Sequence, residues 1–153
     1  MIELKEVKDI EILMAWREEV IRNVFGEEAG SQLLEVNRQY YLQHIVDGAH
    51  IALVAAYQGT DCGCGGICFS EELPSPDNPS GKCAYLMNIY VREEFRKHGI
   101  AHKIVTRLID EAKKHECDKI YLETTAEGRS VYTSLGFREM IDMMKYYGTE
   151  NAD

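Results

Sequence analysis

Residues 83–112 read CAYLMNIYV, REEFRKHG and IAHKIVTRLIDEA, and these three pieces decide the fold. The first piece is apolar except for Asn88, which is typical of a buried strand. Strict alternation would place Met87 and Ile89 on one face of this strand and Asn88 on the other. The third piece starts after Gly99 and repeats apolar residues at helical spacing over three turns, which predicts an amphipathic helix.

The remaining elements are predicted from the same kinds of signal, working outward from this stretch. Strands are expected near residues 2–4, at 50–57 and 65–70 around a turn at 58–61, at 120–124, and within 137–147. Helices are expected between the cap Asp9 and Gly26, between the cap Ser31 and Gly48, and over 129–135 before Gly136. The order β-α-α-β-β-β-α-β-α-β predicts an α/β fold with a mixed sheet, because hairpin strands pair antiparallel and the crossover after residue 91 is parallel.

Length and charge narrow the class of protein. A chain of 153 residues has the size of a single domain, so we expect one active unit over 1–153. No apolar run reaches the length of a membrane span and the first residues are charged, so we expect a cytoplasmic protein without a membrane partner. The net charge of -9 disfavours a nucleic-acid partner.

The cysteines predict neither a disulfide framework nor a metal site. Their number is five, and Cys62, Cys64 and Cys68 lack the second ligand pair that structural zinc sites use. We therefore expect no metal, and we interpret these thiols as small side chains on strands.

Basic residues concentrate between Arg92 and Arg107. Five Lys or Arg residues against two Glu give this segment a charge of +3, which leaves -12 for the rest of the chain. The segment includes the start of the predicted helix at Gly99, where free N–H groups and the helix dipole favour an anion. This pattern predicts a binding site for a polyphosphate, although a solvated basic helix face is the plainer alternative.

The residues Arg96-Lys97-His98-Gly99-Ile100-Ala101 resemble the acyl-CoA signature Arg/Gln-x-x-Gly-x-Gly/Ala, and Tyr132 to Phe137 follow about thirty positions later. In order and spacing, residues 83–140 resemble the GNAT superfamily of N-acetyltransferases. Gly65-Gly66-Ile67, the proline-containing run 74–81 and Glu127-Gly128-Arg129 are similar to a bacterial set of this family, for which we expect small-molecule substrates.

This resemblance implies a site for acetyl-CoA as co-substrate. The strand end at Ile89, Tyr90 and Val91 would pair with the pantetheine amides, and an amide near Ile89 would polarise the thioester carbonyl. The phosphates would be held by the loop and helix start, formed by Arg96, Lys97, His98, Gly99, Ile100, Ala101 and His102.

The resemblance also implies catalytic roles. Tyr132 would protonate the departing thiolate, and Asn88 would contact the acceptor. The resemblance does not name the base, which could be a carboxylate or an ordered water. Glu71 and Glu72, which end the strand before the proline loop, are candidates, although each is also a plausible solvated loop acid. Transfer would occur by direct attack of a primary amine of a small molecule in a ternary complex, because no cysteine has a His at a spacing that would activate it.

Several alternatives remain open at this stage. A catalytically idle acyl-CoA-binding sensor or interaction module would need the phosphate loop but not Tyr132. Ten acidic against five basic residues among the first 50 are compatible with a cationic acceptor, but the acceptor's identity and the acyl length are not predicted. The aromatic segment 143–147 could pair across a homodimer.

Overall fold

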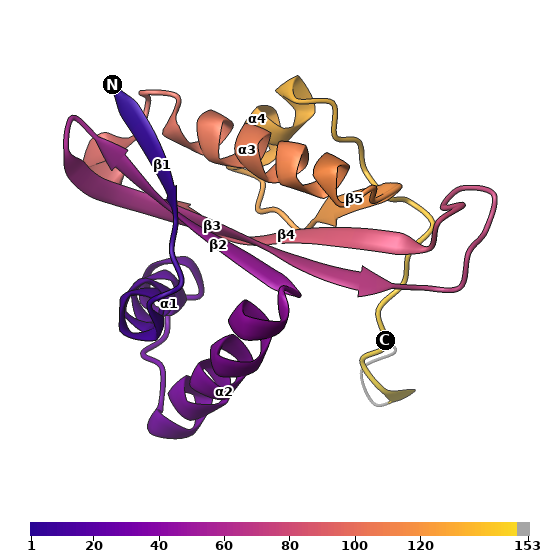
Figure 1. Cartoon of the computed structure of the whole chain (residues 1–153), viewed down its shortest axis with the longest axis horizontal. Helices are drawn as coiled ribbons and strands as arrows, with labels where there is room; N and C mark the ends of the chain where they lie inside the picture. Colours follow the sequence, from indigo (N-terminus) through magenta and orange to yellow (C-terminus); the bar gives the residue numbers. More distant parts are fainter. Residues whose placement is uncertain (150–153) are drawn as a thin grey trace.

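The computed structural model describes residues 1–149. Within them, helices and strands form an α/β fold, shown in Figure 1. The elements are β1 (Ile2–Glu6), α1 (Ile10–Val24), α2 (Ser31–Asp47), β2 (His50–Tyr57), β3 (Thr60–Glu71), β4 (Lys82–Val91), the 3-10 turn η1 (Glu93–Phe95), α3 (Ile100–Lys114), β5 (Lys119–Leu122) and α4 (Arg129–Ser134).

The strands form one mixed sheet in the order β1-β2-β3-β4-β5. Neighbouring strands run antiparallel from β1 to β4, whereas β4 and β5 run parallel and are connected through α3. The predicted mixed sheet with a β-α-β crossover is therefore confirmed.

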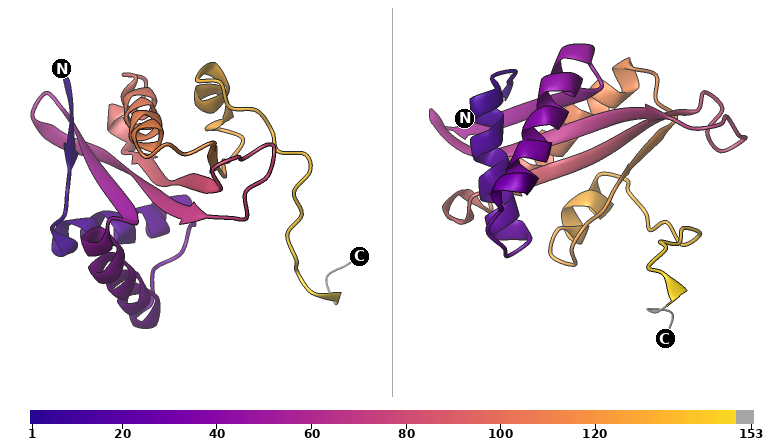
Figure 2. Two further views of the ribbon diagram at one scale, coloured as in Figure 1. Left: turned by 45° about the vertical axis from the view of Figure 1, so that its right-hand side comes forward. Right: turned by 90° about the horizontal axis from the view of Figure 1, so that it is seen from below.

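Helices cover both faces of the sheet. Figures 1 and 2 show α1 and α2 on one face, with α3 and α4 on the other. The apolar stripe of α3 is fully buried against the sheet at Ile100, Ile104, Val105 and Leu108. Each such side chain contributes about 1.5–3 kcal/mol through burial, which anchors the start of α3 beside the end of β4. No helix within residues 1–149 has the length and apolar character needed to cross a membrane.

A bulge at Asn88 changes the predicted faces of β4. Cys64 pairs with Tyr90 and Gly66 with Met87, so β4 carries one more residue than β3 between these pairs. Asn88 takes the extra position with a φ of 58°, a left-handed conformation that Asn tolerates better than most residues. The bulge places Ile89 on the face under α3 and Tyr90 on the face under α1, the reverse of the strict alternation expected from the sequence.

Most predicted boundaries match the structure, and two differ for local reasons. Gln58 and Gly59 both have positive φ and form a two-residue hairpin turn, so β3 begins at Thr60, earlier than expected. Asp9 caps α1 through its side chain as predicted, but Ser31 is the first residue of α2 and the capping position belongs to Gly30.

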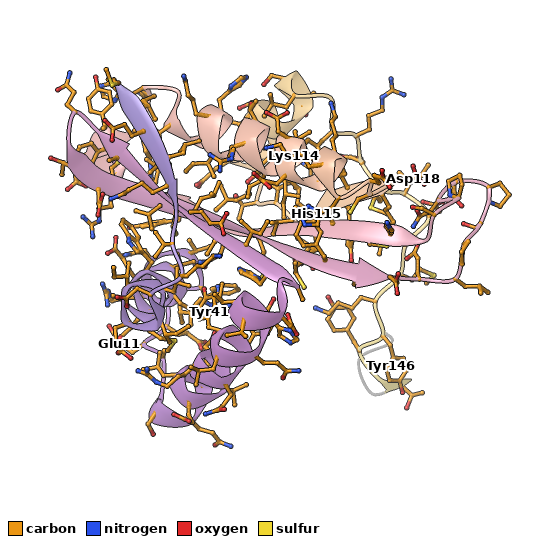
Figure 3. All side chains as sticks on the ribbon, in the orientation of Figure 1. Glu11, Tyr41, Lys114, His115, Asp118 and Tyr146 are labelled. Atoms are coloured by element: carbon orange, nitrogen blue, oxygen red, sulfur yellow. The ribbon has the colours of Figure 1, made fainter. Side chains whose placement is uncertain are left out.

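The strand predicted within Phe137–Tyr147 is wrong for the described residues, because 137–149 contain no strand. The side chains of Met144 and Tyr146 are 100% and 85% exposed. Figure 3 shows Tyr146 on a segment that leads away from the sheet. An alternating apolar segment becomes a strand only when it finds an edge to pair with and a core to cover.

Candidate active site

The last part of β4 has a free edge. Parallel pairing with β5 ends at Leu86 and Leu122, while β4 continues to Val91. The side chains of Tyr90 and Val91 are buried in the two cores, so only their backbone groups face this edge. A free strand edge of this kind can pair with an extended amide-containing ligand as with another strand.

The start of α3 leaves backbone donors without intrahelical partners. The first intrahelical bond from this end joins the Lys103 N–H to the Gly99 carbonyl at 3.1 Å, so the N–H groups of residues 100–102 precede the regular pattern. No side chain of the described part of the chain caps this end, and its first turn contains no acid. Gly99 has a φ of 78°, and a Cβ placed there would meet open space. These features suit an anion that approaches the backbone closely.

Not all of the basic side chains between Arg92 and Arg107 are available to bind an anion. Arg92 forms a two-point ion pair with Glu19 at 2.8 and 2.9 Å, and Arg107 pairs with Glu111 at 3.2 Å. The Arg96 Nε donates to the Val91 carbonyl at 3.0 Å, which ties the loop to the end of β4. Arg96, Lys97 and Lys103 are exposed and have no ion pair within residues 1–149, so these three side chains provide the positive charge that no acid neutralises.

His98 and His102 differ in their surroundings. The Nδ1 of His98 lies 3.0 Å from both the Phe95 and Arg96 carbonyls, and its ring packs against Tyr57 with centroids 4.6 Å apart. His98 therefore shapes the loop, whereas the side chain of His102 is exposed on the first turn of α3.

Tyr132 lies on α4 and packs against the core beneath α3. Its ring meets Phe137 edge to face at 5.9 Å, and its hydroxyl makes no hydrogen bond within the described residues. Burial raises the pKa of the Tyr132 phenol. A protonated phenol without a protein partner can donate its proton to a ligand.

Glu71 and Glu72 lie at the other end of the sheet. Glu71 pairs with Lys82 at the start of β4, and Asn88 is six residues further along that strand, roughly 20 Å away at about 3.3 Å per residue. Hydrogen bonds from Asn78 and then Lys119 lower the pKa of Glu72, which makes it a weaker base. The structure therefore does not bring these two acids to the bulge.

A pocket of about 210 Å³ opens between α1, α2 and β4 on the side opposite α3. Asn88 is part of its lining, which connects this pocket to the free end of β4. Its lining residues are Arg17, Val36, Asn37, Tyr40, Tyr41, His50, Met87 and Asn88.

Polar contacts inside this pocket converge from distant parts of the chain. Arg17 donates to the side-chain oxygens of Asn37 at 3.0 Å and Asn88 at 2.8 Å. The Tyr40 hydroxyl lies 2.7 Å from Nδ1 of His50. Burial, followed by the charges of His44 and Arg17, lowers the pKa of His50 to about 4, so its ring is neutral at pH 7.

Arg17, Tyr40 and His50 are functional candidates that the sequence did not predict. One signal was present: Asn37 falls within the helical stripe of Leu34, Tyr41 and Ile45, where a polar residue needs a partner. Its partner is not visible from local pattern, because Arg17 lies on the preceding helix.

Comparison with known proteins adds independent findings. The model of the acetyltransferase (GNAT) family matches residues 13–137. N-alpha-acetyltransferase 30 of Saccharomyces cerevisiae is 38% identical over 69 residues, which cover 43% of this chain and 39% of the yeast protein. The [ribosomal protein bS18]-alanine N-acetyltransferase of Escherichia coli is 33% identical over 72 residues, 45% of this chain and 49% of that protein.

A solved structure extends the likeness of fold to the whole chain. The crystal structure of a predicted acetyltransferase with acetyl-CoA from Clostridium acetobutylicum has a TM-score of 0.88 at 24% identity and covers 100% of both chains. The chain spans less than half the length of the two curated relatives, and the name of the Escherichia coli protein gives a ribosomal protein as its substrate. The expected restriction to small molecules therefore has no support from these relatives.

Proposed function

Because the chain belongs to the GNAT acetyltransferase family, we propose that it transfers an acetyl group from acetyl-CoA to a primary amine of a small molecule. Residues 1–153 would act as one N-acetyltransferase domain, and the transfer would be direct, in a ternary complex. The observation that carries this proposal is the free end of β4, which leads into the unpartnered start of α3 and is adjacent through Asn88 to the pocket.

The residues present fit acetyl-CoA. Polyphosphate would lie against the N–H groups at the start of α3, with Lys97 and Lys103 nearby, where no acid or side-chain cap competes. The free backbone edge at residues 89–91 would receive the amide-containing arm. When bound, acetyl-CoA supplies an activated thioester.

The chain's own groups would then serve three tasks. The Ile89 amide would donate to the acyl oxygen, and removal of one such donor commonly costs about 10²- to 10³-fold in rate. The Tyr132 hydroxyl would give a proton to the leaving sulfur, a role supported by the raised pKa that keeps the phenol protonated. The pocket would hold the acceptor amine beside the bulge, which converts attack into a step within one complex.

Glu71 and Glu72 are left out of this catalytic group because of their distance from Asn88 and, for Glu72, its ion pair with Lys119. Tyr40 and His50 form a neutral, hydrogen-bonded polar pair in the lining of the same pocket.

The test combines binding and turnover. Calorimetry should show CoA binding, and thiol release from acetyl-CoA should depend on added amine. Lys103→Glu should weaken CoA binding by about 10-fold or more, because it reverses a charge beside the phosphates. Lys113→Glu makes the same change near the other end of α3, where it should leave binding unaltered.

The substitution at Lys103 is informative because an acid in a first helical turn stabilises the helix, so weaker binding would not reflect unfolding. CoA binding without thiol release on any amine would favour the alternative of a non-catalytic acyl-CoA sensor. Absence of CoA binding would refute both readings.

We also propose a homodimer that involves the segment 143–147. Met144 and Tyr146 are exposed, and the outer edge of β5 has no strand partner within the described residues. In a dimer, the segment 143–147 of one copy would pair with the β5 edge of the other copy. Light scattering should then give twice the monomer mass for the full chain, and half that mass after deletion of residues 140–153.

A further inference from the structure

Arg17 occupies an unusual electrostatic position in the pocket. Its side chain is half-buried, and both of its side-chain hydrogen-bond acceptors are neutral amide oxygens, on Asn37 and Asn88. No carboxylate lies within 4.0 Å of it anywhere in residues 1–149. The two amides fix the guanidinium plane without neutralising its charge.

The other half-buried arginines of residues 1–149 show the contrast. Arg92 is paired at two points with Glu19, Arg38 with Glu11, and Arg107 with Glu111. These pairs form even where the side chains are substantially exposed, in a chain with 26 acidic residues. A cation that is withdrawn from water without an acid is costly, and that cost is recovered when an anion binds.

The rest of the pocket has no group that would compete for this charge. Among residues 1–149 its lining contains no carboxylate, and its other members are apolar or neutral, including Val36, Tyr41 and Met87. A cationic acceptor would meet only a like charge here. The excess of acidic residues among the first 50 positions is therefore no guide to the acceptor, because the pocket does not include them.

The position of Arg17 also limits the distance between the attacking nitrogen of the acceptor and any group of the acceptor that binds to Arg17. Arg17 bonds to Asn88, which is followed directly by Ile89, whose amide is assigned above to the acyl oxygen. A group bound to Arg17 thus lies close to the point of attack. The volume of about 210 Å³ is below the ~300–1,000 Å³ typical of drug-sized sites, which favours a compact molecule.

We propose that the acceptor is a small amine that also carries an anionic group, a carboxylate or a phosphate a few bonds from the nitrogen, and that Arg17 binds this group. The inference rests on the proposed acetyl transfer and adds the class of substrate. A planar guanidinium with free N–H groups suits the two oxygens of either anion.

The experiment measures thiol release from acetyl-CoA with matched acceptors. β-Alanine supplies a carboxylate, phosphoethanolamine a phosphate, ethanolamine neither, and putrescine a second cation. A set of α-amino acids and their methyl esters widens the comparison. The variants are Arg17→Gln, Arg17→Lys and the matched control Arg22→Gln, which removes an exposed charge from the same helix outside the pocket.

The expected result is that anionic amines exceed their neutral counterparts in kcat/KM by about 10-fold or more. Arg17→Gln should raise the KM for them by about 10- to 100-fold and abolish the preference, Arg17→Lys should retain part of it, and Arg22→Gln should have no effect. Comparison of β-alanine with phosphoethanolamine shows whether the pocket prefers a carboxylate or a phosphate. CoA affinity should be the same in all variants, which shows that each has folded.

The inference is overturned if ethanolamine, the esters or putrescine are the better acceptors, or if the preference for anions survives in Arg17→Gln. If no amine is acetylated, the proposed function fails separately. Calorimetry of β-alanine and phosphoethanolamine on the CoA complex then tests whether the pocket binds anions. The role of Arg17 is refuted if neither compound binds, or if Arg17→Gln binds them as tightly as the wild type does.

Discussion

Acidification should destabilise this protein through His50, at the start of β2. Its side chain is buried, with 4% exposure, against the rings of Tyr40 and Tyr41. Burial is the main reason that its pKa falls from 6.5 to about 4 in the folded state. Below pH 6.5 the unfolded chain therefore takes up a proton that the native ring refuses.

The direction and the size of the change in stability follow from the difference between the folded and the unfolded pKa of His50. Native stability is complete above the unfolded pKa of 6.5 and declines as the pH falls toward the folded pKa of about 4. The full difference corresponds to about 3 kcal/mol, at about 1.4 kcal/mol for each pKa unit. About 2 kcal/mol of this is lost between pH 7 and pH 5, equivalent to a fall in Tm of roughly 4–8 °C for a chain of this length.

Urea unfolding of the wild type and His50→Gln at pH 7 and pH 5 tests this reasoning. Glutamine cannot titrate, so the free energy of unfolding of His50→Gln should fall by about 2 kcal/mol less than that of the wild type between pH 7 and pH 5. His102→Gln removes an exposed histidine and should behave as the wild type does. Carboxylates such as Glu19, whose pKa is lowered by its hydrogen bond with Arg92, are common to all three proteins and cancel. Equal pH dependence in wild type and His50→Gln would refute the assignment.

Three further predictions concern the proposed site and the thiols. Tyr132→Phe should keep CoA affinity and Tm nearly unchanged and lower turnover by roughly 10²- to 10⁴-fold in the thiol-release assay; a fully active variant would assign the proton transfer to water. Gly99→Ala should cost about 1–2 kcal/mol because of its positive φ and should weaken CoA binding in calorimetry. Gly48→Ala, at a φ of 81° and also with open space at the Cβ, should cost the same and leave binding intact. Cys64 should resist alkylation at pH 8 in mass spectrometry, because burial raises its pKa to about 12, whereas the half-exposed Cys117 should be modified before it.

The helices and the parallel crossover were predictable because their signals are local. The apolar stripe of α3 reports its buried face directly, and Gly48 and Gly136 end helices in the left-handed conformation that glycine accepts without strain. Asp9 caps its helix through N–H groups two and three residues away. Each of these interactions is completed within a few positions of the chain.

Features that need a distant partner were mispredicted. The bulge at Asn88 depends on how β4 is matched to β3, and a shift of one residue exchanges the faces of everything after it. The segment 137–147 has the composition of a strand, but over residues 1–149 the sheet ends at the four residues of β5. Strand composition alone therefore did not determine whether a strand forms.

The candidate pocket shows how much of a site can still be inferred from exceptions to a pattern. Asn37 interrupts an apolar helical stripe, and Asn88 interrupts an apolar strand. A polar side chain at such a position costs about 1–3 kcal/mol unless it finds a hydrogen bond, so each residue implies a partner. Both turn out to accept from the same guanidinium, which lies 71 positions before Asn88. The sequence thus indicated one residue on each of two sides of the pocket. Only the fold could show that Arg17 bonds to both and brings an unneutralised charge to the place where the acceptor would bind.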